Sequence, residues 1–215
     1  MTTTTIPHTT ALQPELRYLA LGDSYTIGEA VDEAGRWPVQ LARALRREGI
    51  AIADPRIIAA TGWTTDELDA AIGAAEPLGE HDFVSLLIGV NNQYRGRTVD
   101  EYRVQFAALL WRAIGFARNR ADRVLVLSIP DWGVTPFAAQ SGRDAAQIAR
   151  HLDAYNAAAR EVCAQRGVAF VDITAVSRAR GAESAMLADD GLHPSAAMYA
   201  EWTRLAFPVA HRLLA

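Results

Sequence analysis

Short apolar runs alternate with helix-like patterns along almost the whole chain, and this alternation restricts the possible folds more than any other feature. Such a run, closed by glycine or proline, is typical of a buried strand, whereas apolar residues repeated every three or four positions indicate a helix. The expected strands cover residues 18–21, 83–88, 124–129 and 168–171, with two β-prone pieces inside 50–60. The expected helices cover residues 37–48, 65–74, 98–117, 143–165 and 195–214. This order predicts an α/β fold with a mostly parallel sheet covered by helices on both faces.

Length and composition fit one domain. The 215 residues are 50% hydrophobic and 21% charged, which suits a compact domain with a full core. We expect a single domain over residues 15–215. The Thr-rich start, residues 1–14, lacks the basic and apolar regions of a secretory signal and is expected to be a disordered lead-in.

Charge and hydropathy exclude several classes of partner. The chain has 21 basic and 25 acidic residues, a net charge of −4 and no basic block, so nucleic acid is not an expected partner. No apolar stretch reaches the roughly 18 residues of a membrane-spanning helix, and we expect a cytoplasmic protein. The one cysteine, Cys163, is assigned to the core. No histidine pair has metal-binding spacing, so we expect neither metal nor cofactor.

Four polar segments follow the ends of expected strands, and they carry the residue types needed for acyl transfer. They are Gly22–Ser24, Thr61–Gly62, Gly89–Asn92 and Asp190–His193. Because the carboxyl ends of parallel strands share one edge of a sheet, we expect these segments to converge there. The same residue types are also common in ordinary turns, which is the alternative interpretation of each segment.

The chemistry follows from the residue types. A serine hydroxyl is a weak nucleophile and needs a base within hydrogen-bond reach. His193 can act as that base for Ser24, and Asp190, three residues earlier, can hold the imidazole in the required tautomer. Asp23 is expected to accept a hydrogen bond that stabilises the turn at Ser24 rather than to act as a second base.

A tetrahedral intermediate also needs hydrogen-bond donors for its oxyanion. The backbone N–H groups of Ser24 and Gly62 and the side chain of Asn91 can supply three. Gly62 could instead simply end a strand, and Asn91 and Asn92 could be turn residues that tolerate left-handed backbone.

The four segments resemble the four sequence blocks of the SGNH hydrolases, the GDSL esterase/lipase superfamily. The matching stretches, in the family's order, are GDSYTIGEA, ATGWTTDEL, IGVNNQYRG and DGLHPSAAMY. The resemblance implies a flavodoxin-like three-layer α/β/α sandwich with a five-stranded parallel sheet. It also implies metal-free hydrolysis of esters or thioesters by Ser24, His193 and Asp190, with Ser24, Gly62 and Asn91 as the oxyanion hole. The third block departs from the family, which usually has Asp where this chain has Asn92, a side chain that cannot carry the negative charge of an Asp.

Five residues near the expected edge are candidates for the substrate pocket: Tyr25, Tyr94, Arg95, Trp132 and Phe137. The aromatic side chains favour a small apolar acyl or aryl group, and Arg95 could bind a carboxylate or phosphate. Trp132 and Phe137 could equally pack their loop onto the sheet.

We therefore predict a serine esterase that acts on small acyl esters through an acyl-enzyme intermediate. Two alternatives remain open. One is a non-catalytic ligand-binding module on the same fold, and the other is an acyltransferase or thioesterase. The sequence alone leaves the oligomeric state open.

Overall fold

Five parallel strands form the central sheet of the computed structural model, which describes residues 15–215; the lead-in predicted over residues 1–14 lies outside the described residues. The strands are β1 (Tyr18–Gly22), β2 (Arg56–Ala59), β3 (Phe83–Leu87), β4 (Val124–Leu127) and β5 (Ala169–Val171). Their order in the sheet is β2-β1-β3-β4-β5. Residues of β1, β3 and β4 are buried throughout, as expected for strands covered on both faces.

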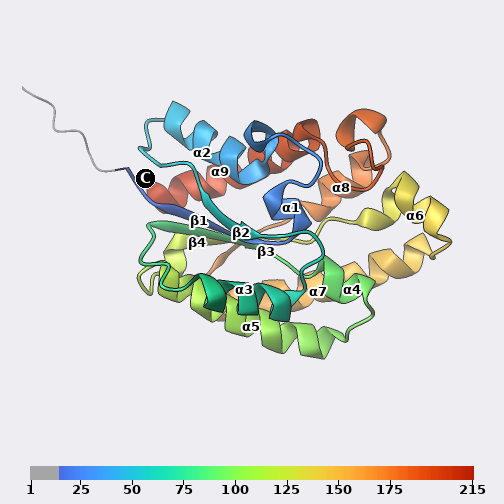
Figure 1. Ribbon diagram of the computed structural model, residues 1–215, viewed down its shortest axis with the longest axis horizontal. Coiled ribbons are helices and arrows are strands. Elements are labelled where there is room, and N and C mark those ends of the chain that lie inside the picture. The colour runs from blue at the N-terminus through green and yellow to red at the C-terminus, as the bar shows by residue number, and fades with distance from the viewer. Residues whose placement is uncertain (1–14) are drawn as a thin grey trace, which may run out of the picture.

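Helices cover the sheet on both faces and complete a three-layer sandwich (Figure 1). One layer holds α2 (Trp37–Arg47) and α9 (Ala196–Leu214), which pack against each other, and the opposite layer holds α3 (Thr65–Ala75), α5 (Val99–Phe116) and α7 (Ala145–Arg166). The predicted α/β/α fold with a five-stranded parallel sheet is confirmed. Within residues 15–215, no helix is both long and apolar enough to cross a membrane.

Side-chain caps explain why the long helices start where they do. The Thr64 hydroxyl and the Glu67 carboxylate form the capping box that begins α3, and the Thr98 hydroxyl accepts the Glu101 N–H, at 3.1 Å, to begin α5. Such caps satisfy N–H groups that have no partner inside the helix. The helices expected over residues 65–74 and 98–117 therefore start within one residue of the observed α3 and α5.

The sequence pattern did not predict several short helices. They are α1 (Ser24–Ile27), α4 (Val90–Tyr94), α6 (Pro136–Ser141) and α8 (Thr174–Arg180), with 3₁₀ turns at Glu33–Gly35, Ala121–Arg123, Trp132–Val134 and Ser184–Met186. A helix of one or two turns is too short to show a hydrophobic period. The segment 131–142, which lies between the strand expected at 124–129 and the helix expected at 143–165, contains one of these turns and all of α6.

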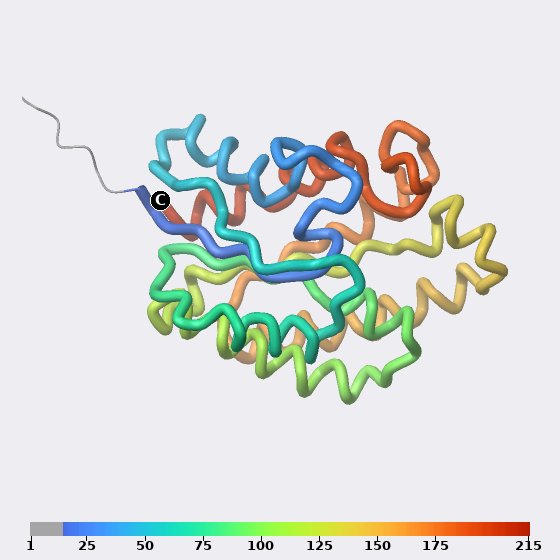
Figure 2. Tube along the Cα trace, viewed as in Figure 1, coloured from blue at the N-terminus to red at the C-terminus, as the bar shows by residue number. Residues whose placement is uncertain are grey.

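The strand order places a crevice at the carboxyl end of the sheet. From β1 the chain crosses by α2 to β2 on one side, and β3 then returns to the other side of β1 (Figure 2). Ligands of open α/β sheets bind beyond the strands' carboxyl ends at such a reversal. The segments that follow β1, β2 and β3 all meet there.

Candidate active site

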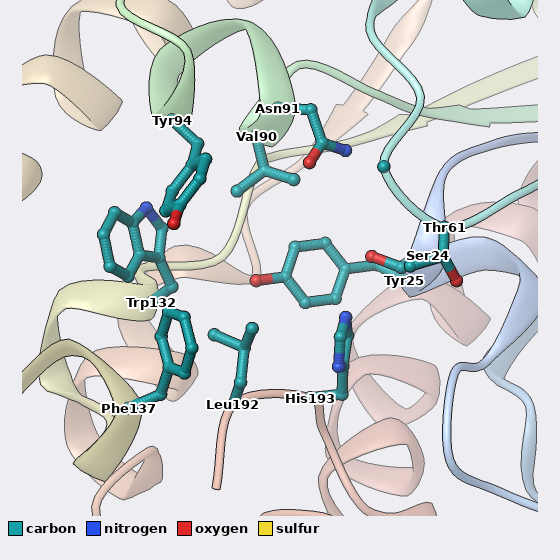
Figure 3. A pocket seen from close by; sticks show the side chains of 11 residues that line it. Ser24, Tyr25, Thr61, Val90, Asn91, Tyr94, Trp132, Phe137, Leu192 and His193 are labelled. Carbon is teal, nitrogen blue, oxygen red and sulfur yellow. The ribbon is translucent and has the colours of Figure 1, made fainter. Parts of the chain in front are cut away.

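A cavity of about 150 Å³ opens at the carboxyl edge of the sheet (Figure 3). Its walls come from the segments after β1, β2, β3 and β4 and from the loop before α9. The lining residues are Ser24, Tyr25, Thr61, Gly62, Val90, Asn91, Tyr94, Trp132, Phe137, Leu192 and His193. The structure thus gathers three of the four polar segments, together with His193 of the last one, around one space.

Ser24 is carried into this cavity by a tight strand-to-helix turn. β1 ends at Gly22, where a Cβ atom would lie 2.5 Å from the carbonyl oxygen of Leu87 and clash with the Thr26 side chain, so the turn requires glycine. Asp23 caps α1 by accepting the Tyr25 N–H at 3.0 Å, as the sequence predicted. Ser24 follows as the first helical residue, and its hydroxyl has no hydrogen-bond partner among the described residues.

Asp23 lies entirely inside the protein beneath the serine. Its Oδ1 atom caps α1, while Oδ2 has no hydrogen-bond partner among the described residues. Burial raises the pKa of this carboxyl to about 7, although the backbone N–H of Tyr25 counteracts the effect. The group therefore titrates in a range where carboxyl groups are normally fully ionised.

His193 and Asp190 form a hydrogen-bonded pair in the loop before α9. The Nδ1 atom of His193 lies 2.6 Å from Asp190 Oδ2. The other carboxylate oxygen, Oδ1, accepts the backbone N–H groups of Leu192 and His193, each at 2.9 Å. Partial burial acts to raise the pKa of Asp190, but these hydrogen bonds outweigh it and hold the pKa below its ordinary value. Asp190 is therefore an ionised acceptor that fixes the imidazole orientation.

The position of this loop differs from the sequence prediction. Asp190 does not follow a strand, because α8 and a 3₁₀ turn intervene after β5. An isolated antiparallel bridge between Leu187 and Pro194 closes the loop instead, with Ala188 N–H donating to the His193 carbonyl at 2.8 Å. The bridge brings His193 to the cavity, so the expected convergence holds for a different reason.

Three residues that line the cavity carry hydrogen-bond donors with spare capacity. The backbone N–H groups of Ser24 and Gly62 have no partner among residues 15–215. The Asn91 amide donates to the Trp63 carbonyl at 2.9 Å, which leaves its second N–H available. Gly62 has a φ of 87°, a left-handed conformation that favours glycine. These donors are the three that the sequence predicted for an oxyanion.

Arg95 lies beside the cavity and does not line it. Its Nη2 atom donates to the Gly62 carbonyl at 2.7 Å, and Nη1 pairs with Glu67 at 3.0 Å. The guanidinium is thus engaged with the loop that carries Gly62, and its binding of a substrate anion stays a prediction.

Asn92 is fully buried and holds the start of α3. Its Oδ1 accepts the Thr65 N–H at 3.1 Å, and its Nδ2 donates to the Thr65 hydroxyl at 2.7 Å. The Thr65 hydroxyl in turn donates to Gln105. A neutral amide therefore occupies the position where the family usually has Asp, and it makes no ion pair.

An aromatic wall closes the side of the cavity opposite Ser24. Trp132 meets Tyr94 and Phe137 edge-on, with ring centroids 5.4 and 6.3 Å apart. Trp132 is also 2% exposed and donates from Nε1 to Gln93 at 2.9 Å. It therefore both packs its loop and lines the cavity, so the two interpretations of this residue are compatible.

Three residues of the polar segments line the cavity although the sequence assigned them no role there, and a fourth residue, Arg143, lies next to it without having been predicted at all. Thr61, Val90 and Leu192 line it, and each directly adjoins a residue that the motifs had singled out. Arg143 stacks on the outer face of Tyr94, 4.0 Å from the ring centroid. No local signal links Arg143 to Tyr94, which lies far away in the sequence. Within the described residues, no three His, Cys, Asp or Glu side chains converge as a metal-ligand set.

Comparison with known proteins identifies the family. Residues 20–201 match the model of the GDSL-like lipase/acylhydrolase family, and the chain belongs to that family. The match runs from β1 into α9 and includes all the lining residues of the cavity. The suspected membership of the SGNH/GDSL hydrolases is confirmed. No curated protein sequence matches the chain.

Solved structures share the fold at low sequence identity. The structure of TesA is 22% identical, with a TM-score of 0.69 over 92% of this chain and 99% of that one. A lipase/acylhydrolase from Enterococcus faecalis is 20% identical, with a TM-score of 0.71 over 93% and 98%. Axe2, an acetylxylan esterase from Geobacillus stearothermophilus, is 18% identical, with a TM-score of 0.68 over 91% and 94%. At these identities the likeness concerns the fold.

Proposed function

We propose that the protein is a serine esterase that hydrolyses small acyl esters, with Ser24 as nucleophile, His193 as general base and Asp190 as the group that orients it. The observation that carries the proposal is the hydrogen-bonded Asp190–His193 pair at the wall of the cavity that the Ser24 hydroxyl faces. Figure 3 displays Ser24 and His193 on the same side of that cavity. A nucleophile beside a base that a third group orients is the arrangement that serine hydrolases use.

The first half of the reaction acylates the enzyme. Ser24 Oγ attacks the ester carbonyl carbon and gives its proton to His193 Nε2, while the carbonyl oxygen becomes an oxyanion. The N–H groups of Ser24, Gly62 and Asn91 stabilise that charge. The C–O bond to the alcohol then breaks, and His193 returns the proton to the departing alkoxide. The products are an alcohol and Ser24 acylated on Oγ.

The second half releases the acid. Water gives a proton to His193 and attacks the acyl carbonyl, and the oxyanion forms again at the same donors. Collapse of this intermediate breaks the bond to Ser24 Oγ, which regains a proton from His193. Asp190 remains ionised throughout and stabilises the transient imidazolium. No cofactor enters this sequence.

The size of the cavity supports a small acyl group. Its volume of about 150 Å³ is below the usual range of drug-sized ligand pockets, and apart from Ser24, Thr61, Asn91 and His193 the lining is mainly apolar and aromatic. The acetylxylan esterase activity named for one structural neighbour is likewise directed at a short acyl group.

Hydrolysis of p-nitrophenyl acetate and butyrate by the wild type and Ser24→Ala tests the proposal. We expect ester cleavage by the wild type and a loss of at least about 10³-fold in the variant, since removal of the nucleophile leaves only the residual effect of the other groups. Equal rates for both proteins would contradict the proposal and favour a non-catalytic binding module. Added alcohol acceptors separate hydrolysis from acyl transfer through the products formed.

A further inference from the structure

A second, smaller cavity lies behind the first. It has a volume of about 20 Å³ and is lined in part by Met186, Met198 and Trp202. The two cavities share three wall residues, Tyr25, Trp132 and Leu192. We call the larger one the catalytic cavity and the smaller one the inner cavity.

The three shared wall residues form a partition between the two cavities, and Tyr25 is its central member. Its ring lies edge-on to His193 and to Trp202, with both centroid distances at 5.9 Å. His193 lines only the catalytic cavity, and Trp202 lines only the inner cavity. In Figure 3 the ring extends from the Ser24 side across the cavity, with its hydroxyl directed toward Trp132. A group that enters beside Ser24 therefore meets the Tyr25 ring before it reaches the inner cavity.

The other two members of the partition are held in place. Trp132 is fixed by its hydrogen bond to Gln93 at 2.9 Å, and the Leu192 N–H is fixed by Asp190 at 2.9 Å. By contrast, the Tyr25 hydroxyl makes no hydrogen bond to a described residue, so the ring is held by packing alone. Replacing Tyr25 removes the wall without breaking a side-chain hydrogen bond.

The inner cavity presents an apolar surface despite its polar lining residues. One carboxylate oxygen of Asp131 accepts a hydrogen bond from the Gly133 N–H, and the other accepts one from Arg178 Nε. The hydroxyls of Thr135 and Ser177 donate to backbone carbonyls at 2.7 Å. Apart from the Tyr25 hydroxyl and the Trp202 indole N–H, which has no hydrogen-bond partner among the described residues, the lining offers a guest mainly hydrocarbon and thioether. Methionine side chains adapt readily to new contents.

We infer that Tyr25 sets the length of acyl chain that the enzyme accepts, by closing the catalytic cavity against the inner cavity. This inference rests on the proposed esterase function. It assigns short linear acyl groups to the wild type and places the path for longer chains behind the Tyr25 ring. Tyr25 is thus a specificity-determining residue, distinct in role from its neighbour Ser24.

A chain-length series of p-nitrophenyl esters from acetate to decanoate tests this assignment. We expect Tyr25→Ala to raise the octanoate-to-acetate ratio of kcat/KM by about tenfold or more, in keeping with the discrimination that added methylenes give in apolar pockets. Tyr25→Phe keeps the ring and is expected to keep the wild-type chain-length profile. Adding Met186→Phe to Tyr25→Ala refills the inner cavity and should reverse the gain, which a general loosening of the site would not.

Two further comparisons make the outcome decisive. Leu192→Ala opens the partition from its other side and should shift the profile in the same direction, so the test does not depend on the folding of one variant. Acetate esters of increasingly long alcohols should show no such shift, since the alcohol does not enter this path. An active wild type with the same profile in Tyr25→Ala and Leu192→Ala would overturn the inference alone. A wild type that cleaves no ester of the series would overturn the proposed function.

Discussion

The guanidinium of Arg95 donates a hydrogen bond to the carbonyl oxygen of Gly62 at 2.7 Å. The same guanidinium pairs with Glu67, whose carboxylate also accepts the Thr64 N–H at 2.8 Å. Arg95 therefore ties the residue proposed as an oxyanion donor to the start of α3. The Gly62 carbonyl is held in this way, while the Gly62 N–H group, in the preceding peptide unit, has no hydrogen-bond partner among residues 15–215.

Arg95 should consequently act as a positioning residue. We expect Arg95→Ala to lower kcat by about tenfold with little change in KM, less than the roughly 10²–10³-fold cost of deleting an oxyanion donor. Arg95→Lys, which keeps one donor, should recover part of the loss. The measurement is steady-state kinetics with a neutral and an anionic ester of matched size. A selective loss with the anionic ester would instead support substrate binding by Arg95.

Asn92 should contribute to stability through Thr65. Asn92→Ala leaves the buried Thr65 N–H without its acceptor, and we expect a loss of about 1–3 kcal/mol in the free energy of unfolding. Asn92→Asp keeps an oxygen acceptor for that N–H and should cost less. Urea unfolding of the three proteins at neutral pH checks this order. Equal free energies of unfolding for the wild type and Asn92→Ala would contradict a stabilising role for the Asn92–Thr65 hydrogen bonds.

Asp23 should make stability depend on pH. Burial raises its pKa from 3.8 to about 7, so the folded chain holds this proton more tightly than the unfolded chain does. Stability from this group is therefore complete below pH 3.8 and declines as the pH rises through 7. Asp23→Asn keeps the cap oxygen but does not titrate.

The difference between wild type and Asp23→Asn isolates this effect from the other titrating groups. We expect the two proteins to have similar free energies of unfolding at low pH. As the pH rises, the wild type should become less stable than Asp23→Asn, by up to about 1.4 kcal/mol for each unit of pKa shift. Denaturant unfolding across that range is the measurement. A stability difference that stays constant with pH would contradict the assignment.

Asp190 should act through the tautomer of His193. Asn in its place can still accept the two backbone N–H groups, but its NH₂ would face His193 Nδ1 and force the proton onto Nε2. The imidazole could then no longer accept the Ser24 proton, so we expect Asp190→Asn to lose about 10⁴-fold in kcat. Thermal unfolding should remain close to that of the wild type. A variant that retains more than about a tenth of the activity would contradict this role.

The sequence predicted the sheet and the long helices because their signals are local. The apolar run before Gly22 and the capping pair Thr64 and Glu67 each carry their structure within a few residues. α8 could not be found in this way, since its seven residues show no clear period. The position of Asp190 after a bridge rather than a strand depends on the Leu187–Pro194 pairing, which is a tertiary contact.

In the candidate site too, the residues inside local motifs were predicted, whereas the arrangements set by tertiary contacts were not. The motifs contained Ser24, Asn91 and His193 as well as their neighbours on the cavity wall. Arg95 has the right position in the chain for the pocket, yet its direction is set by Gly62 and Glu67, which lie in another segment. The inner cavity behind Tyr25 combines residues from four separate regions, so no local pattern could reveal it.

Covalent labelling of Ser24 shows whether this serine is an activated nucleophile. A fluorophosphonate reacts with a serine that an adjacent base activates, and peptide mass spectrometry locates the adduct. We expect one adduct on Ser24 in the wild type, none in Ser24→Ala and strongly slowed labelling in His193→Ala. An unlabelled wild type, or an adduct on another residue that persists in Ser24→Ala, would contradict it.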